Sequence, residues 1–155
     1  MNIKEKTVIK PLPDDLEIVK REEIWRLKLP IDYKIFIKKY NGGIPQEQSF
    51  NFNDHCYAVL RFLAIVKNIK ENDLGCYDID VIESQIGERL TNNMDLIGMK
   101  VVPIAELFGG DYVCLDFRES ENPVVCIWYH EESGEFDPYT KELAISFEFF
   151  LEMLK

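Results

Sequence analysis

The sequence predicts an α+β domain, in which an antiparallel or mixed sheet of short strands carries helices packed on one face. Segments with helical periodicity come first, alternating strand-like segments follow and enclose one more helix, and an amphipathic segment ends the chain. The 155 residues fit one domain of ordinary size, and 46% hydrophobic with 30% charged residues is typical of a globular protein. We therefore expect a single domain over residues 1–155.

The N-terminal part should form an extended arm followed by a helix. Residues 1–13 contain Pro11 and Pro13, which favour an extended chain. Asp14 or Asp15 can then cap a helix, because an aspartate side chain accepts hydrogen bonds from the free amides of a first turn. The apolar side of this helix is predicted from Leu16, Val19, Ile24 and Leu27, widened by Ile18 and Trp25.

A second helix is predicted to begin at Pro30, because the missing N–H of proline costs nothing at the first helical position. Four aromatic and aliphatic residues then recur on one helical face: Tyr33, Phe36, Ile37 and Tyr40. Asn41-Gly42-Gly43 should end the helix, since glycine adopts the left-handed conformation without steric cost.

The middle of the chain predicts a hairpin and a third helix. Phe50 and Phe52 alternate with asparagines, as in a strand. Asn53-Asp54 is typical of a turn, and residues 57–65 are predicted to form the returning strand. After a polar loop, Asp78 or Asp80 can cap a helix that carries Ile82, Ile86 and Leu90.

One more strand, a second hairpin and a last helix complete the prediction. The strand at 99–104 contains Pro103, which indicates an edge position or a strand end, because proline donates no ladder hydrogen bond. Ser146 can cap a terminal helix over 147–154.

The second hairpin has the clearest pattern. Residues 111–117 and 123–130 flank a polar stretch, and centring it on Ser120 places Cys114 opposite Cys126. This register gives one almost wholly apolar face: Val113, Leu115, Phe117, Val125, Ile127 and Tyr129. The other face holds Tyr112, Cys114, Asp116, Val124, Cys126, Trp128 and His130. Because a one-residue slip would mix the two sets, the pattern favours this register.

The net charge of −10 is concentrated near the end of the chain. Residues 1–105 contain 15 Lys/Arg and 16 Asp/Glu, whereas residues 106–155 contain 3 and 12, a net charge of −9. Such a field repels nucleic acid and membrane phosphates and attracts a basic partner. The alternative reading, that acidic surfaces simply keep the protein in solution, fits the charge equally well.

The spacing of the cysteines and histidines does not predict a catalytic or metal-binding site. The four cysteines include no CxxC pair, so we expect reduced thiols and no metal site. Cys126 and His130 are four residues apart on one strand, about 13 Å, too far for a nucleophile and its base. We therefore expect no enzymatic activity and no cofactor.

The sequence also predicts where the protein resides. No apolar run approaches the ~20 residues of a membrane span, and Met1–Lys6 lacks the apolar core of a signal peptide. A cytoplasmic protein without membrane contact is the expectation.

Several stretches together resemble a known family. They are Leu29-Pro30, Asp32-Tyr33, Phe36 and Tyr40-Asn41-Gly42-Gly43, then Gly109-Gly110-Asp111 with Leu115-Asp116, then Trp128 before an acidic stretch, and finally 147–154. In this order they resemble the SUKH superfamily, whose members include bacterial toxin-immunity proteins and a fungal regulator of cell-wall synthesis. The chain resembles in particular the cytoplasmic immunity partners of exported LXG-type toxins that end in a nuclease.

The resemblance implies a protein without catalytic activity that binds a cognate basic toxin domain, an RNase or DNase, and blocks its active site. The charge asymmetry places the partner surface on the C-terminal hairpin, where interface anchors favour aromatic residues ringed by acid. The candidate residues are Asp111, Tyr112, Asp116, Glu119, Glu121, Trp128, Glu131, Glu132 and Asp137. The alternative is a regulatory or scaffolding module, as in the fungal relatives, and self-association is left open.

Overall fold

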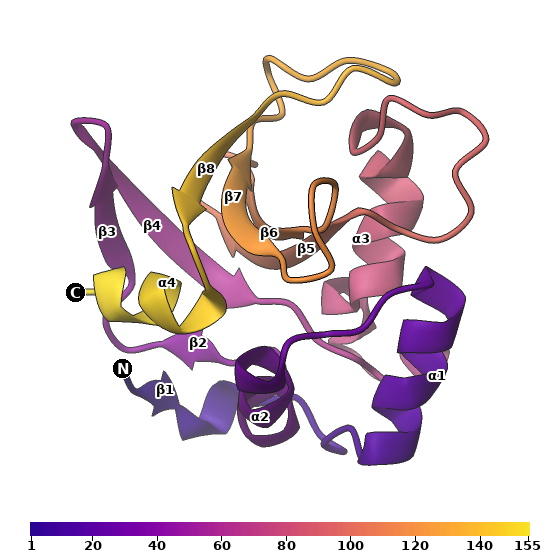
Figure 1. Cartoon of the computed structure of the whole chain (residues 1–155). Helices are drawn as coiled ribbons and strands as arrows, with labels where there is room; N and C mark the ends of the chain where they lie inside the picture. Colours follow the sequence, from indigo (N-terminus) through magenta and orange to yellow (C-terminus); the bar gives the residue numbers. More distant parts are fainter.

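The computed structural model describes residues 1–155 and is built around a six-stranded antiparallel sheet in the order β3-β4-β5-β6-β7-β8 (Figure 1). Its strands are β3 (Ser49–Phe52), β4 (His55–Phe62), β5 (Val101–Leu107), β6 (Tyr112–Asp116), β7 (Val124–Trp128) and β8 (Thr140–Ala144). A second sheet pairs β1 (Ile3–Lys4) with β2 (Ile44–Pro45). The helices are α1 (Asp15–Trp25), α2 (Ile31–Tyr40), α3 (Ile79–Ile86) and α4 (Phe147–Met153). The α+β prediction is confirmed.

The helices and the sheet share one main core of 27 buried residues. Aromatic side chains join the layers: the ring centroid of Phe36 on α2 lies 4.7 Å from that of Phe62 and 5.1 Å from that of Phe147. Both termini lie on the side of α4, away from α1 and α3 (Figure 1). None of the helices is long and apolar enough to cross a bilayer.

The N-terminal segment is fixed to the body of the protein. After β1 it forms a 3-10 turn at Glu5–Thr7, and the Ile9 amide then donates to the Asn41 carbonyl (2.7 Å). The fully buried Asn41 side chain donates to the carbonyls of Ile9 (3.1 Å) and Ile65 (3.0 Å) and accepts from the Ile65 amide (2.9 Å). Asn41 therefore joins the arm, the end of α2 and the exit of β4. The adjoining Gly42 adopts the predicted left-handed conformation, at φ +67°.

Helix α1 begins as predicted, with the Asp14 side chain accepting a hydrogen bond from the Glu17 amide. Its predicted apolar face is confirmed at Ile18 and Trp25, which are buried, and wrong at Leu16, Val19 and Ile24, which are exposed. The buried face consists of Ile18, Arg21, Glu22 and Trp25. This face can be buried because both of its charged residues find partners in other parts of the fold.

The partners of Arg21 and Glu22 tie three helices together. Arg21 forms ion pairs with Asp78 (2.9 Å) and Asp80 (2.9 Å) at the start of α3. Glu22 accepts from the Leu29 amide (2.7 Å) and pairs with Lys34 of α2 (3.1 Å). The orientation of α1 is thus set by hydrogen bonds to charged groups as well as by apolar packing.

The position predicted for Pro103 is also wrong. β5 lies inside the sheet, between β4 and β6, and Pro103 is neither on an edge strand nor at a strand end. The register of β5 with β6 shifts between Pro103 and Ala105. Such a bulge accommodates a residue that has no N–H to donate to the ladder.

The β6–β7 hairpin has the predicted register, with Cys114 opposite Cys126. Val113, Leu115, Val125 and Ile127 belong to the main core. The other face carries a second cluster formed by Leu90, Val101, Cys114, Cys126 and Trp128. This cluster is closed by the chain that follows α3, so both faces of the hairpin are covered.

Candidate functional site

The hairpin distributes the predicted acidic residues to its two ends. Asp116, Glu119 and Glu121 lie at or beyond the end of β6, in the loop to β7. Four others lie at the opposite end: Asp111, Glu131, Glu132 and Asp137. Since β6 has five residues, about 17 Å of strand separates the two groups. The two ends therefore have to be considered separately.

At the first end, Arg118 neutralises Asp116. Its Nε and Nη2 donate to the two carboxylate oxygens at 2.9 and 2.8 Å, and Nη2 also donates to Thr140 Oγ1 (2.7 Å). The hydrogen bonds from Arg118 to Asp116 outweigh the burial of the guanidinium and raise the pKa of Arg118. Asp116 thus fixes the β6–β7 loop, and because Arg118 neutralises its charge, it would attract a basic partner only weakly.

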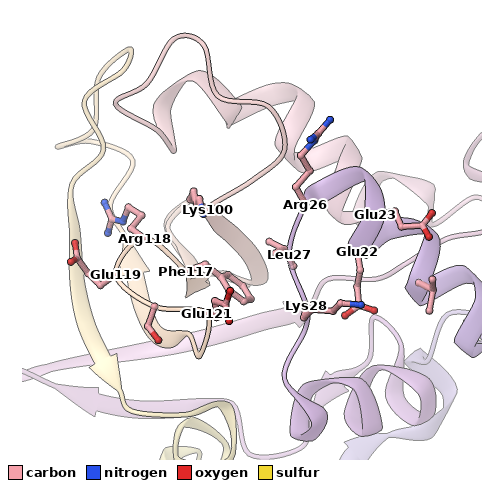
Figure 2. A pocket seen from close by; sticks show the side chains of 12 residues that line it. Glu22, Glu23, Arg26, Leu27, Lys28, Lys100, Phe117, Arg118, Glu119 and Glu121 are labelled. Atoms are coloured by element: carbon pink, nitrogen blue, oxygen red, sulfur yellow. The ribbon is translucent and has the colours of Figure 1, made fainter.

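A cleft of about 630 Å³ lies between this loop and the end of α1 (Figure 2). Val19, Leu27 and Phe117 form its apolar part, and charged side chains surround them. Its basic residues are Arg26, Lys28, Lys100 and Arg118, and its acidic residues are Glu22, Glu23, Glu119 and Glu121. Equal numbers of positive and negative groups line the cleft, so Glu119 and Glu121 share it with cations.

Main-chain hydrogen bonds join the segments that border the cleft. The Met99 amide donates to the Trp25 carbonyl (2.9 Å), and the Phe117 amide donates to the Lys100 carbonyl (2.7 Å). Gly98 permits the first contact, because a Cβ there would lie 2.4 Å from the Trp25 carbonyl oxygen. Arg26 ends α1 in the left-handed conformation, at φ +59°.

At the second end, a hydrogen-bonded pair braces the turn between β5 and β6. Asp111 Oδ1 accepts from the His130 amide (2.9 Å) and lies 2.7 Å from His130 Nδ1. The carboxylate only accepts, so Nδ1 carries the proton. No hydroxyl or thiol is hydrogen-bonded to this ring, and the pair acts as a brace.

The β7–β8 loop is anchored on the chain that follows α3 (Figure 1). Arg89 donates to the carbonyls of His130 and Ser133, the second at 2.8 Å. The Phe136 amide donates to the Glu88 carbonyl (2.6 Å). These contacts give a long surface loop a defined conformation.

The carboxylates of the β7–β8 loop are exposed, and Arg89 binds the main chain of this loop rather than its acids. We call the four exposed loop residues Glu131, Glu132, Glu135 and Asp137 the acidic end; Asp111 is half-buried against His130 and is not counted in it. The acidic residues of the loop form no ion pair with a lysine or arginine, and Glu131 Oε1 lies 4.0 Å from His130 Nε2. Lys141 instead lies over the Tyr129 ring, 5.7 Å from its centroid. Negative charge is thus less compensated here than in the cleft.

Trp128 does not belong to the surface. Its side chain is fully buried, its Nε1 donates to the Arg89 carbonyl (2.8 Å), and the Arg89 guanidinium lies 5.1 Å from its ring centroid. The expectation of an exposed tryptophan anchor is therefore corrected: the turn after α3 covers this face of the hairpin. Tyr112 is half-buried beside it, and burial, with the charge of Glu106, raises the pKa of Tyr112 to about 12.

Residues 15–151 match the family model SUKH_6, described as SMI1-KNR4 cell-wall. The chain belongs to this SUKH family. It is 27% identical over 111 residues to the SPbeta prophage-derived uncharacterized protein YokK of Bacillus subtilis (strain 168), an alignment that covers 68% of this chain and 56% of the relative. The chain thus spans about half the length of that relative. No solved structure matches it.

The residues that carry the SUKH resemblance mostly hold the fold together. Asn41 makes three buried hydrogen bonds, and Asp111 binds His130. A Cβ on Gly110 would lie 3.3 Å from the His130 ring, and its φ is +97°. Asn41, Gly110 and Asp111 thus serve the fold of this SUKH protein.

Sequence reasoning missed two features of the site. Phe108 is 76% exposed on the turn between β5 and β6; a phenylalanine directly before two glycines, where the strand pattern ends, was the available signal. The cleft had no signal of its own, because Arg26, Lys100 and Glu121 come from segments far apart in the sequence. No group of three or more His, Cys, Asp and Glu side chains is arranged to hold a metal ion.

Proposed function

We propose that this SUKH protein is a non-enzymatic immunity protein, which binds a cognate toxin domain and keeps its active site from the substrate. The family includes toxin-immunity proteins, and this membership supports the general class. The observation that carries the specific proposal is the acidic end, where exposed carboxylates of an anchored loop lack lysine or arginine partners.

The charge of the acidic end suits a toxin that acts on nucleic acid. A nuclease needs a basic surface to hold phosphates. Carboxylates on a fixed loop can occupy that surface and steer the two proteins together, which raises the association rate constant at low salt. The proposed partner is therefore a basic RNase or DNase domain, encountered in the cytoplasm, and neither nucleic acid nor a membrane binds directly.

The proposed contact residues are those of the acidic end, with Glu119 and Glu121 as a secondary group. Glu119 and Glu121 line the cleft beside basic residues, so their charge is partly balanced before any partner arrives. Asp116 is bound by Arg118, and Trp128 is buried, so both act by supporting the hairpin.

Charge reversal at the acidic end tests this function. The ligand is the toxin domain encoded beside this chain's gene, purified in a catalytically inactive form. We expect Glu131→Lys with Glu132→Lys to lower the association rate constant about tenfold or more at low salt and to flatten its salt dependence. Stopped-flow fluorescence measures both quantities.

The matched control reverses two other exposed acids, Glu142→Lys with Glu152→Lys, so that the net charge changes equally. A control that slows association as much as the acidic-end variant would show that only total charge matters. A wild-type protein that neither binds the toxin domain nor inhibits it would end the immunity proposal itself.

A further inference from the structure

Phe108 is presented to solvent in a way that suits an interface anchor. Its side chain is 76% exposed, as much as that of any large apolar residue in the chain. It follows Leu107, which is fully buried and ends β5, and its amide donates to the Ala58 carbonyl of β4 (2.9 Å). The backbone of Phe108 thus continues the pairing of β4 with β5 at the end of β5, while its side chain is exposed to water.

The turn that carries Phe108 is braced on its other side. Gly109 and Gly110 both have φ +97°, a conformation that other residues rarely adopt. The His130 ring lies against Gly110, and Asp111 binds both the amide and the ring of His130. The Gly110 amide also donates to the Leu107 carbonyl (3.2 Å). Because the turn is already ordered, binding of a partner at Phe108 costs little conformational entropy of the turn.

The surroundings of Phe108 indicate the chemistry of what covers it. Its turn ends at Asp111, and His130, which Asp111 holds, is followed by the exposed Glu131 and Glu132. A second copy of this chain would bring the same carboxylates together, and like charges at an interface cost free energy. A basic surface with an apolar recess complements both the ring and the acids.

We propose that Phe108 is the apolar anchor of the toxin interface, inserting into a recess bordered by lysine and arginine side chains on the toxin domain. This inference rests on the proposed function and specifies its docking surface. Phe108 supplies the buried contact that slows dissociation, and the neighbouring carboxylates supply the attraction that speeds association.

Truncation of the ring tests the anchor. With the inactive toxin domain encoded beside the gene as ligand, Phe108→Ala is expected to weaken binding about 30-fold, chiefly through faster dissociation, while the association rate constant and its salt dependence stay near wild type. Phe149→Ala is the matched control, because Phe149 is also an exposed phenylalanine, 52% exposed on α4. We expect it to change binding less than threefold.

The outcomes separate the two proposals. If wild type binds and Phe108→Ala binds equally well, the anchor is refuted while the immunity function stands. If wild type does not bind, both proposals fall. Thermal unfolding checks that Phe108→Ala folds like wild type, and sedimentation of the free protein checks self-association. A dimer that Phe108→Ala dissolves would assign the ring to a second copy and overturn the anchor.

Discussion

Two adjacent charged residues of α1, Arg21 and Glu22, are buried, although such side chains are seldom found inside proteins without partners. Burial alone would lower the pKa of Arg21, but hydrogen bonds and charges from Asp78 and Asp80 outweigh it and raise the pKa. Asp78 also accepts from the amides of Val66 (2.7 Å) and Asp80 (2.8 Å). The Asp78 carboxylate thus accepts hydrogen bonds from α1, from the segment after β4 and from the start of α3.

Removing that carboxylate should be costly. We expect Asp78→Ala to lower the free energy of unfolding by about 3–5 kcal/mol, because the amides of Val66 and Asp80 lose their acceptor and the buried Arg21 guanidinium loses one of its two carboxylate partners. Urea unfolding followed by circular dichroism measures the loss. Lys38→Met is the control: it breaks the exposed pair with Asp15 (2.9 Å) and should cost far less than Asp78→Ala. Equal losses in the two variants would contradict this account of Arg21.

At the scale of elements, the hairpins could be predicted because neighbouring residues determine their register and their turns. The Cys114–Cys126 register follows from alternation, because a slip by one residue turns every side chain to the other face. The turn at Asn53-Asp54 follows from residue type, and both residues have positive φ, +48° and +64°.

The β3–β4 turn offers a stabilising substitution. Two-residue turns of this kind favour glycine at the second position, because it adopts positive φ without strain. We expect Asp54→Gly to raise the free energy of unfolding by about 0.5 kcal/mol, the relief of strain exceeding the entropy that glycine adds to the unfolded chain. The urea midpoint measures it. Asp73→Gly, at an exposed position without positive φ, should give no gain; a gain there as well would argue against relief of turn strain.

The elements that sequence reasoning misplaced depend on distant contacts. The face of α1 is decided by Asp78 and Asp80, more than fifty residues away. Pro103 is tolerated inside the sheet because a bulge interrupts the ladder beside it. Trp128 is buried because the turn after α3 closes over it. Helical or alternating periodicity contains no information on any of these contacts.

At the scale of the whole molecule, the charge of the last third does not form one field. The hairpin carries part of it into a cleft shared with basic residues and part to an end where lysine and arginine partners are lacking. The net charge of residues 106–155 could be counted from the sequence, but its division could not, because Arg26, Lys28 and Lys100 come from other segments.

The packing of the whole molecule also determines which thiols react. Cys56 and Cys76 are exposed, whereas Cys114 and Cys126 are buried between the hairpin and the chain after α3. Burial, together with the neighbouring Cys126 thiol, raises the pKa of Cys114 well above its usual range, so little reactive thiolate forms. We expect a disulfide exchange reagent to modify two thiols rapidly in the native protein and all four in urea. Rapid modification of more than two in the native state would contradict the packing of this second cluster.

The separation of the two hairpin ends also bears on how complexes of this protein assemble. A molecule bound at Phe108 and one bound between Leu27 and Phe117 would lie at opposite ends of the β6–β7 strand pair, which is about 17 Å long. Occupants of modest size would not exclude each other, so a ternary assembly is sterically open. In a competition assay, a small compound lodged beside Leu27 should then disturb at most the secondary contacts of Glu119 and Glu121, and full displacement of the molecule bound at Phe108 would imply a conformational link between the two ends.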